Sequence, residues 1–85
     1  MPSLIEAGAI IVDVRTPGEY AQGSAAGSIN IPLDDLEKRV SGLDRAKTVI
    51  VCCASGARSA MAATILKSKG FQKVVNAGPW QNACV

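Results

Sequence analysis

The sequence contains no histidine among its 85 residues. Histidine is the most common general base in enzymes and the most common metal ligand among side chains. Its absence excludes Ser-His-Asp and Cys-His catalysis within this chain, together with zinc sites that include histidine. We expect no metal ion and no cofactor, so any chemistry has to come from other side chains.

The chain also lacks a strong charge of either sign and a long apolar run. Nine Lys and Arg residues against seven Asp and Glu residues give a net charge of +2, and the basic residues are scattered. This pattern is not that of a nucleic-acid or membrane-surface protein. No stretch approaches the roughly 20 apolar residues that cross a bilayer. With no visible targeting signal, we expect a cytoplasmic protein; the alternative is a periplasmic one whose signal peptide has been trimmed.

The length and composition predict a single domain over residues 1–85. Two separate cores would need a longer chain, whereas 48% hydrophobic residues are enough for one core. We expect a monomer or a weak dimer.

Short β-branched runs alternate with helical patterns along the chain. Strands are predicted at 10–14 and 48–52, with weaker candidates at 28–31 and 72–76. Helices are predicted at 17–22, 34–42 and 59–69, the last ending at Gly70, and a short helical turn at 3–7. This order predicts an α/β fold, a small open and mostly parallel sheet flanked by helices. Ligands bind at the carboxyl ends of the strands in such sheets, so the loop after residue 52 is the segment of interest.

Three cysteines form an odd set, and two of them are adjacent: Cys52, Cys53 and Cys84. A disulfide scaffold is therefore a poor interpretation, and reduced thiols are expected. Cys52 continues an apolar strand and is expected to face the core. Cys53 opens a loop of small residues that leads into the predicted helix, where backbone N–H groups and the helix dipole stabilise a thiolate.

Cys53 is the predicted catalytic nucleophile, and the remaining loop residues are predicted to bind the substrate. Arg58 offers a fixed positive charge and a planar fork of donors for an oxyanion. Ser59 is expected to be at least the helix N-cap. The predicted substrate-binding residues are Arg58, Ala54, Ser55, Gly56, Ala57 and Ser59.

The loop from Cys53 to Ser59 resembles the C-x-x-G-x-R-S active-site loop of the rhodanese (thiosulfate sulfurtransferase) family, particularly its small single-domain members of the phage-shock-protein-E type. Three further stretches are similar to family motifs: Asp13-Val14-Arg15 with Glu19-Tyr20, Gly23 with residues 27–33, and Gly78-Pro79-Trp80. The resemblance spans roughly residues 10 to 80. It implies a rhodanese-like fold and a two-step sulfur transfer, in which the Cys53 thiolate takes sulfur from thiosulfate or a similar small anionic donor as a persulfide. A thiol, either small or on a protein, or cyanide then removes that sulfur.

The chain departs from the family pattern at four places. Ser24 stands where the family usually has histidine, Cys52 where it has an aromatic residue, and Pro79 where it has a second glycine. The usual first strand is missing or shortened before Ile10, which predicts an open sheet edge.

The sequence is also compatible with other functions. Counted from Cys52, Arg58 lies at the C-x5-R-S spacing of cysteine-dependent phosphatases and arsenate reductases. Gly56 lies three residues after Cys53, as in the sulfurtransferase loop, and favours Cys53. A non-catalytic rhodanese-like binding module and a Cys52/Cys53 redox switch are the further alternatives.

Overall fold

The two β-branched runs form the centre of a parallel sheet. The computed structural model describes residues 8–83. In it, β1 (Ile10–Asp13) pairs in parallel with β3 (Val49–Cys53), with Val12 opposite Val51. Every residue of β3 is buried. Such a strand has no solvent-facing side, which explains its continuous apolar sequence.

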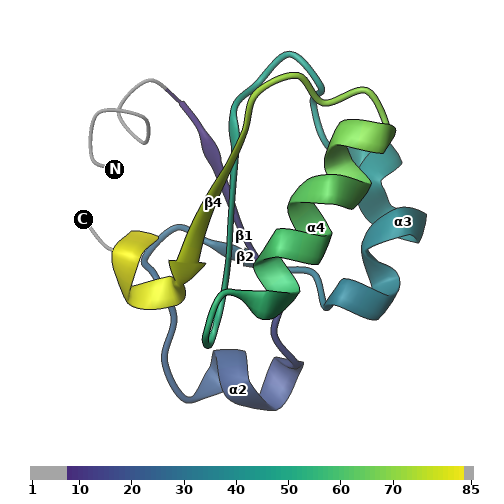
Figure 1. The fold of residues 1–85 in the computed structure, drawn as a ribbon. Coiled ribbons are helices and arrows are strands. Elements are labelled where there is room, and N and C mark those ends of the chain that lie inside the picture. Colours follow the sequence, from purple (N-terminus) through teal and green to yellow (C-terminus); the bar gives the residue numbers. More distant parts are fainter. Residues whose placement is uncertain (1–7, 84–85) are drawn as a thin grey trace.

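Two further strands complete the sheet in the order β2-β1-β3-β4, with parallel pairing throughout (Figure 1). β2 is only Ile29–Asn30. β4 runs over Val74–Pro79, so the prediction of 72–76 was wrong at both ends. β4 extends because β3 continues to Cys53, which pairs with Pro79, and because a bulge absorbs Ala77. Within residues 8–83, β4 pairs on its β3 side only, and an edge strand tolerates a proline.

The helices follow their sequence signals with some shifts. α2 (Pro17–Ala21) starts with the predicted capping box, and α4 (Ala57–Ser68) is followed by Gly70 at φ +95°. The segment predicted as one helix over 34–42 is divided into a 3₁₀ turn at 33–35, α3 (Leu36–Arg39) and a second 3₁₀ turn at 40–42. Asp34 and Asp35 precede α3, but neither side chain forms a capping hydrogen bond at its start. The predicted turn at 3–7 and Cys84 lie outside the described residues.

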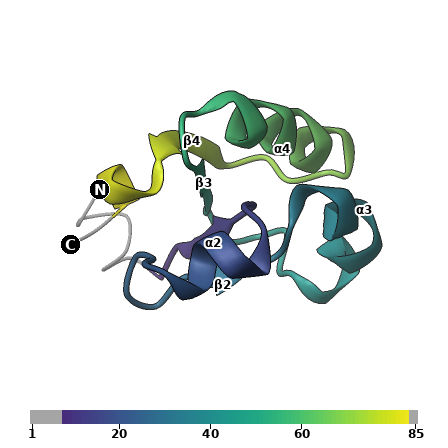
Figure 2. The same cartoon turned by 90° about the horizontal axis from the view of Figure 1, so that it is seen from below.

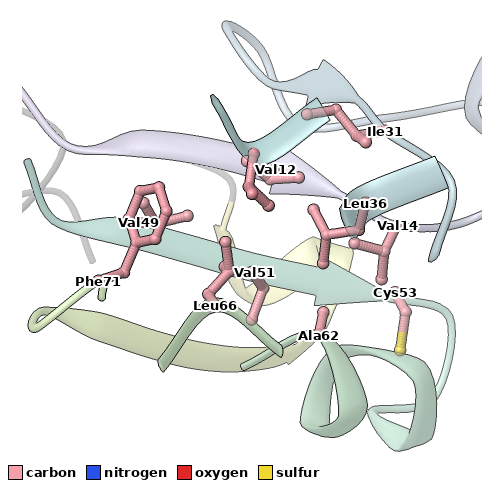
Figure 3. Close-up of a cluster of buried hydrophobic side chains, with 11 residues drawn as sticks. Val12, Val14, Ile31, Leu36, Val49, Val51, Cys53, Ala62, Leu66 and Phe71 are labelled. Atoms are coloured by element: carbon pink, nitrogen blue, oxygen red, sulfur yellow. The ribbon is translucent and has the colours of Figure 1, made fainter. Parts of the chain in front are cut away.

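Each face of the sheet has its own apolar cluster. The first lies under α3 and α4 and contains Val12, Val49, Val51, Leu66 and Phe71 (Figure 3). The second lies on the opposite face, against the 3₁₀ helix Trp80–Ala83, and contains Ile11, Ile50 and Ala77. Figure 2 shows α4 and α3 on one side of the sheet and the 3₁₀ helix on the other. No helix within residues 8–83 has the length and apolar character needed to cross a membrane.

Candidate active site

Cys53 is the last residue of β3, and strand alternation decides where its side chain points. Successive strand residues face opposite sides of a sheet. Val49, Val51 and Cys53 therefore face α3 and α4, and the Cys53 sulfur lies beside the first turn of α4 (Figure 3). The sequence placed Cys53 in the loop, but it is a buried strand residue whose sulfur lies next to that loop.

The sulfur of Cys53 accepts hydrogen bonds from backbone amides of the loop and of α4. The Gly56 N–H donates to Cys53 Sγ at 2.9 Å, and the Ser59 N–H donates at 3.4 Å. Ser59 is the third residue of α4, so the sulfur occupies the place of a capping oxygen. These amides form the predicted anion cradle at a helix N-terminus.

Gly56, rather than Ser59, is the N-cap residue of α4. Its φ is +106°, a conformation that side chains rarely adopt, and a Cβ there would lie 3.5 Å from the Gly78 Cα. The expectation that Ser59 caps the helix was wrong, because the helix begins two residues earlier than predicted. The chain can turn sharply at Gly56, so α4 already starts at Ala57.

The Ser59 hydroxyl connects the sulfur to strand β4. Its oxygen accepts from the Cys53 thiol at 3.4 Å, and its single proton has two acceptors in reach, Asn76 Oδ1 at 2.6 Å and Gly56 O at 3.0 Å. When Cys53 is a thiolate, the sulfur becomes a third acceptor for that proton. Asn76 Oδ1 also accepts from the Gly78 N–H at 2.9 Å. Sequence reasoning missed Asn76, because its role depends on the pairing of β4 with β3, and a lone asparagine in a strand pattern carries no signal of that pairing.

The pKa of Cys53 is lower than the ordinary value of 9.0. Burial of the sulfur raises the pKa. Hydrogen bonds from the Ser59 hydroxyl and from the backbone N–H groups of Ser59, Gly56 and Ser55 lower it, and together they outweigh the effect of burial. All of these donors stabilise the thiolate, which is the nucleophilic form of cysteine. Loop and helix groups therefore stabilise the thiolate form of Cys53 without a histidine.

Arg58, the predicted anion-binding residue, is held by a glutamate from another helix. Its NH1 donates to Glu19 Oε1 at 2.7 Å, and its NH2 donates to Glu19 Oε2 at 3.0 Å. Ala54, Ser55 and Ala57 are exposed around the loop, and their side chains are small. The predicted loop residues thus gather around Cys53, while two of the N–H donors of Arg58 are engaged by Glu19 of α2.

Cys52 lies on the opposite face of the sheet from Cys53. It is fully buried in the second cluster, and its thiol points to Val12 O at 3.8 Å. Its expected position in the core is confirmed. The C-x5-R-S alternative needs the Cys52 sulfur inside the loop, and the alternation of β3 places it elsewhere. Cys52 and Cys53 are not bonded to each other, and their opposite directions do not support a redox switch between them.

Two other motifs hold the segments around the loop. Asp13 is fully buried and accepts four hydrogen bonds from Arg15, the shortest at 2.7 Å. The Arg15 guanidinium also donates to Gly23 O and stacks 5.2 Å from the centroid of the Trp80 ring. A Cβ on Gly23 would lie 3.4 Å from that ring, at the short limit of ordinary van der Waals contact, so the ring packs closely against this glycine. Through these contacts Arg15 links the end of β1, the segment after α2 and the residue that follows β4.

A cavity of about 260 Å³ lies beside this assembly. Four segments line it: the turn between β1 and α2, α2 itself, the segment after α2, and the start of the last 3₁₀ helix. The lining residues are Arg15, Glu19, Gln22, Gly23 and Trp80. Trp80 follows Pro79, the register partner of Cys53, and Glu19 is the partner of Arg58. Two lining residues, Glu19 and Trp80, thus lie next to residues that contact or pair with the cysteine loop. Residues 8–83 contain no group of three His, Cys, Asp or Glu side chains that could hold a metal ion.

Comparison with known proteins agrees with this architecture. The Rhodanese-like domain family matches residues 2–78. The thiosulfate sulfurtransferase PspE of Escherichia coli is 41% identical over 69 residues, covering 79% of this chain and 66% of that protein. A sulfurtransferase of Allochromatium vinosum is 36% identical over 67 residues, covering 79% and 63%.

A solved structure described as a rhodanese with anions from E. coli superposes with a TM-score of 0.82 at 36% identity, covering 88% of this chain and 91% of that one. The chain spans about two thirds of the two curated relatives above and 37% of another, from Bacillus subtilis. The fold and the order of the motifs agree with the family match over most of the sequence, and the chain belongs to the rhodanese-like domain family.

Proposed function

We propose that this chain is a sulfurtransferase that moves a sulfane sulfur from thiosulfate, or a similar small anionic donor, to a thiol or cyanide through a persulfide on Cys53. The observation that carries the proposal is the set of N–H groups on the Cys53 sulfur, from Gly56 at 2.9 Å and Ser59 at 3.4 Å. The names of the relatives, sulfurtransferase and thiosulfate sulfurtransferase, support the same reaction class.

In the first step the Cys53 thiolate attacks the outer sulfur of thiosulfate. A new S–S bond forms on Cys53, the S–S bond of thiosulfate breaks, and sulfite leaves with the electron pair. Sulfite leaves as a stable anion and needs no proton, so the step requires no general acid. This explains why a chain without histidine can carry it out.

The amide cradle stabilises the charge in both steps. The persulfide carries its charge on the outer sulfur, next to the N-terminus of α4, where N–H groups and the helix dipole favour an anion. In the second step an acceptor thiolate or cyanide attacks that outer sulfur, and the bond to Cys53 breaks. The products are a persulfide of the acceptor, or thiocyanate, and the regenerated Cys53 thiolate.

The test is mass spectrometry of the chain after treatment with thiosulfate. We expect the Cys53 peptide to gain the mass of one sulfur atom and to lose it when cyanide is added. Cys53→Ser should abolish both the adduct and the turnover. Cys52→Ala, a buried thiol on the other face of the sheet, is the matched control and should keep both. A wild-type chain that gains no sulfur is instead a binding module, and the proposal fails.

A further inference from the structure

Glu19 occupies one edge of the Arg58 guanidinium, the edge formed by its two terminal nitrogens, which Arg58 could otherwise offer to an anionic donor. The two side chains form a two-pronged pair, with N–O distances of 2.7 and 3.0 Å. A carboxylate binds a guanidinium in the same planar geometry as an oxyanion of a substrate. Glu19 therefore competes with such an oxyanion for this edge of Arg58.

The capping box of α2 holds the Glu19 carboxylate in place. The Thr16 N–H and hydroxyl donate to Glu19 Oε1 at 3.2 and 3.1 Å. The Arg58 guanidinium, followed by the Thr16 backbone, lowers the pKa of Glu19 to about 2. The carboxylate is thus charged at every pH at which a thiolate enzyme works.

The ion pair of Arg15 with Asp13 is buried, and it offers a comparison for the exposed pair of Arg58 with Glu19. Arg15 and its partner Asp13 have side chains that are 6% and 0% exposed, and Arg15 is closed off by Gly23 O and the Trp80 ring. The side chains of Arg58 and Glu19 are 35% and 37% exposed. Buried pairs are costly to break, whereas exposed ones open at little cost. Of these two arginines, Arg58 is the one that a substrate can take over.

The cavity of about 260 Å³ beside α2 brings solvent to the same pair, since Glu19 is one of its walls. Its other charged wall residue, Arg15, is neutralised by Asp13 behind it. An anion that enters the cavity therefore encounters the negative charge of Glu19. The one cationic side chain among the described lining residues, Arg15, is already paired with Asp13.

We infer that Glu19 is a specificity-determining residue, which keeps Arg58 in a neutral pair and makes anionic sulfur donors compete with its carboxylate. This inference rests on the proposed function, because it concerns the donor of that reaction. It predicts that the wild-type chain binds thiosulfate less tightly than a chain without the Glu19 charge. The difference in affinity should depend on the presence of Arg58.

The test compares thiosulfate binding to Cys53→Ala chains with and without Glu19→Gln, by calorimetry. The Cys53→Ala change prevents turnover, and glutamine keeps the capping box of α2. We expect Glu19→Gln to tighten binding about two- to fivefold at low ionic strength, the range for opening an exposed ion pair. The gain should shrink as salt screens the charges. In chains that keep Cys53, KM for thiosulfate should fall with little change in kcat.

Two controls separate this from a structural or a general charge effect. Glu37→Gln removes the same charge from an exposed position on α3 and should change neither value. In an Arg58→Ala background, most of the gain from Glu19→Gln should be lost. Unchanged or weaker binding in Glu19→Gln, or a gain that persists without Arg58, would overturn the inference. The proposed function stands or falls separately, on whether wild-type Cys53 gains sulfur.

Discussion

At the scale of single residues, the Ser59 hydroxyl is the side chain that most directly adjusts the pKa of Cys53. It lies 3.4 Å from Cys53 Sγ and lowers the pKa of that thiol. Asn76 Oδ1 lies 2.6 Å from the same hydroxyl and competes with the thiolate for its single proton. The reactivity of Cys53 therefore depends on a side chain of α4 and, through it, on one of β4.

We predict that Ser59→Ala raises the pKa of Cys53, because one donor to the thiolate is lost while burial still opposes the charge. At neutral pH the thiolate fraction falls, and Cys53 should react more slowly with iodoacetamide. The measurement is the alkylation rate against pH. Thr64→Ala, which removes an exposed hydroxyl bonded only to Ala60 O in the same helix, is the control. An unchanged pKa in Ser59→Ala would show that the backbone amides alone set it.

The sequence was a good guide to single residues where the signal is local. Gly56 needs its positive φ, and its N–H lies on the sulfur of Cys53, whereas Cys52 lies on the opposite face of the sheet. The spacing that favours Cys53 as the catalytic residue therefore agrees with the geometry, and the catalytic role stays a prediction. The contact between Arg58 and Glu19, 39 residues apart, could not be predicted in this way. It requires the amino end of α2 and the first turn of α4 to meet, and only the register of the sheet brings them together.

At the scale of elements, the buried pair of Asp13 and Arg15 joins the end of β1 to the segment after α2. Asp13 is fully buried and Arg15 is 5% exposed, so neither charge is solvated by water. Asn30 of β2 adds bonds from its Nδ2 to Asp13 O and Arg15 O, at 3.0 and 2.9 Å. These contacts fix the wall of the cavity on which Glu19 lies.

We predict that Asp13→Ala lowers the free energy of unfolding by about 3–5 kcal/mol, because it leaves a buried guanidinium without its partner. That is a large share of the roughly 5–15 kcal/mol of a typical domain. Urea denaturation measures the change, and Asp13→Asn, which keeps the shape, provides a second and milder variant. Asp34→Ala, at an exposed position, should change stability by no more than about 0.5 kcal/mol. A similar small loss in both alanine variants would show that the pair contributes little.

Element types were easier to predict than element bounds. The β-branched runs of β1 and β3 and the Thr16–Glu19 capping box are local patterns, and the structure confirms them. The bounds of β4 were wrong because Gly78 and Pro79 are poor strand residues by themselves. They become strand residues only because Cys52 and Cys53 pair with them.

At the scale of the whole molecule, the absence of histidine limits which groups can titrate near neutral pH. The pKa of Cys53 lies below 9.0, whereas Glu19 stays charged down to a pKa of about 2. Arg58 therefore keeps its carboxylate partner across the whole working range. Within the described site, Cys53 is the group whose charge changes with pH.

We predict that the rate of persulfide formation from thiosulfate rises with pH in a single step and then stays level, with its midpoint below 9. The sign follows from the mechanism, because the thiolate attacks and a higher pH increases its fraction. A chain with a histidine acid would lose activity again on the alkaline side and give a bell-shaped curve. Stopped-flow rates against pH, together with alkylation of Cys53 by neutral iodoacetamide, should give the same midpoint. A bell-shaped profile, or two different midpoints, would show that a second titrating group takes part and would contradict a mechanism in which Cys53 alone titrates.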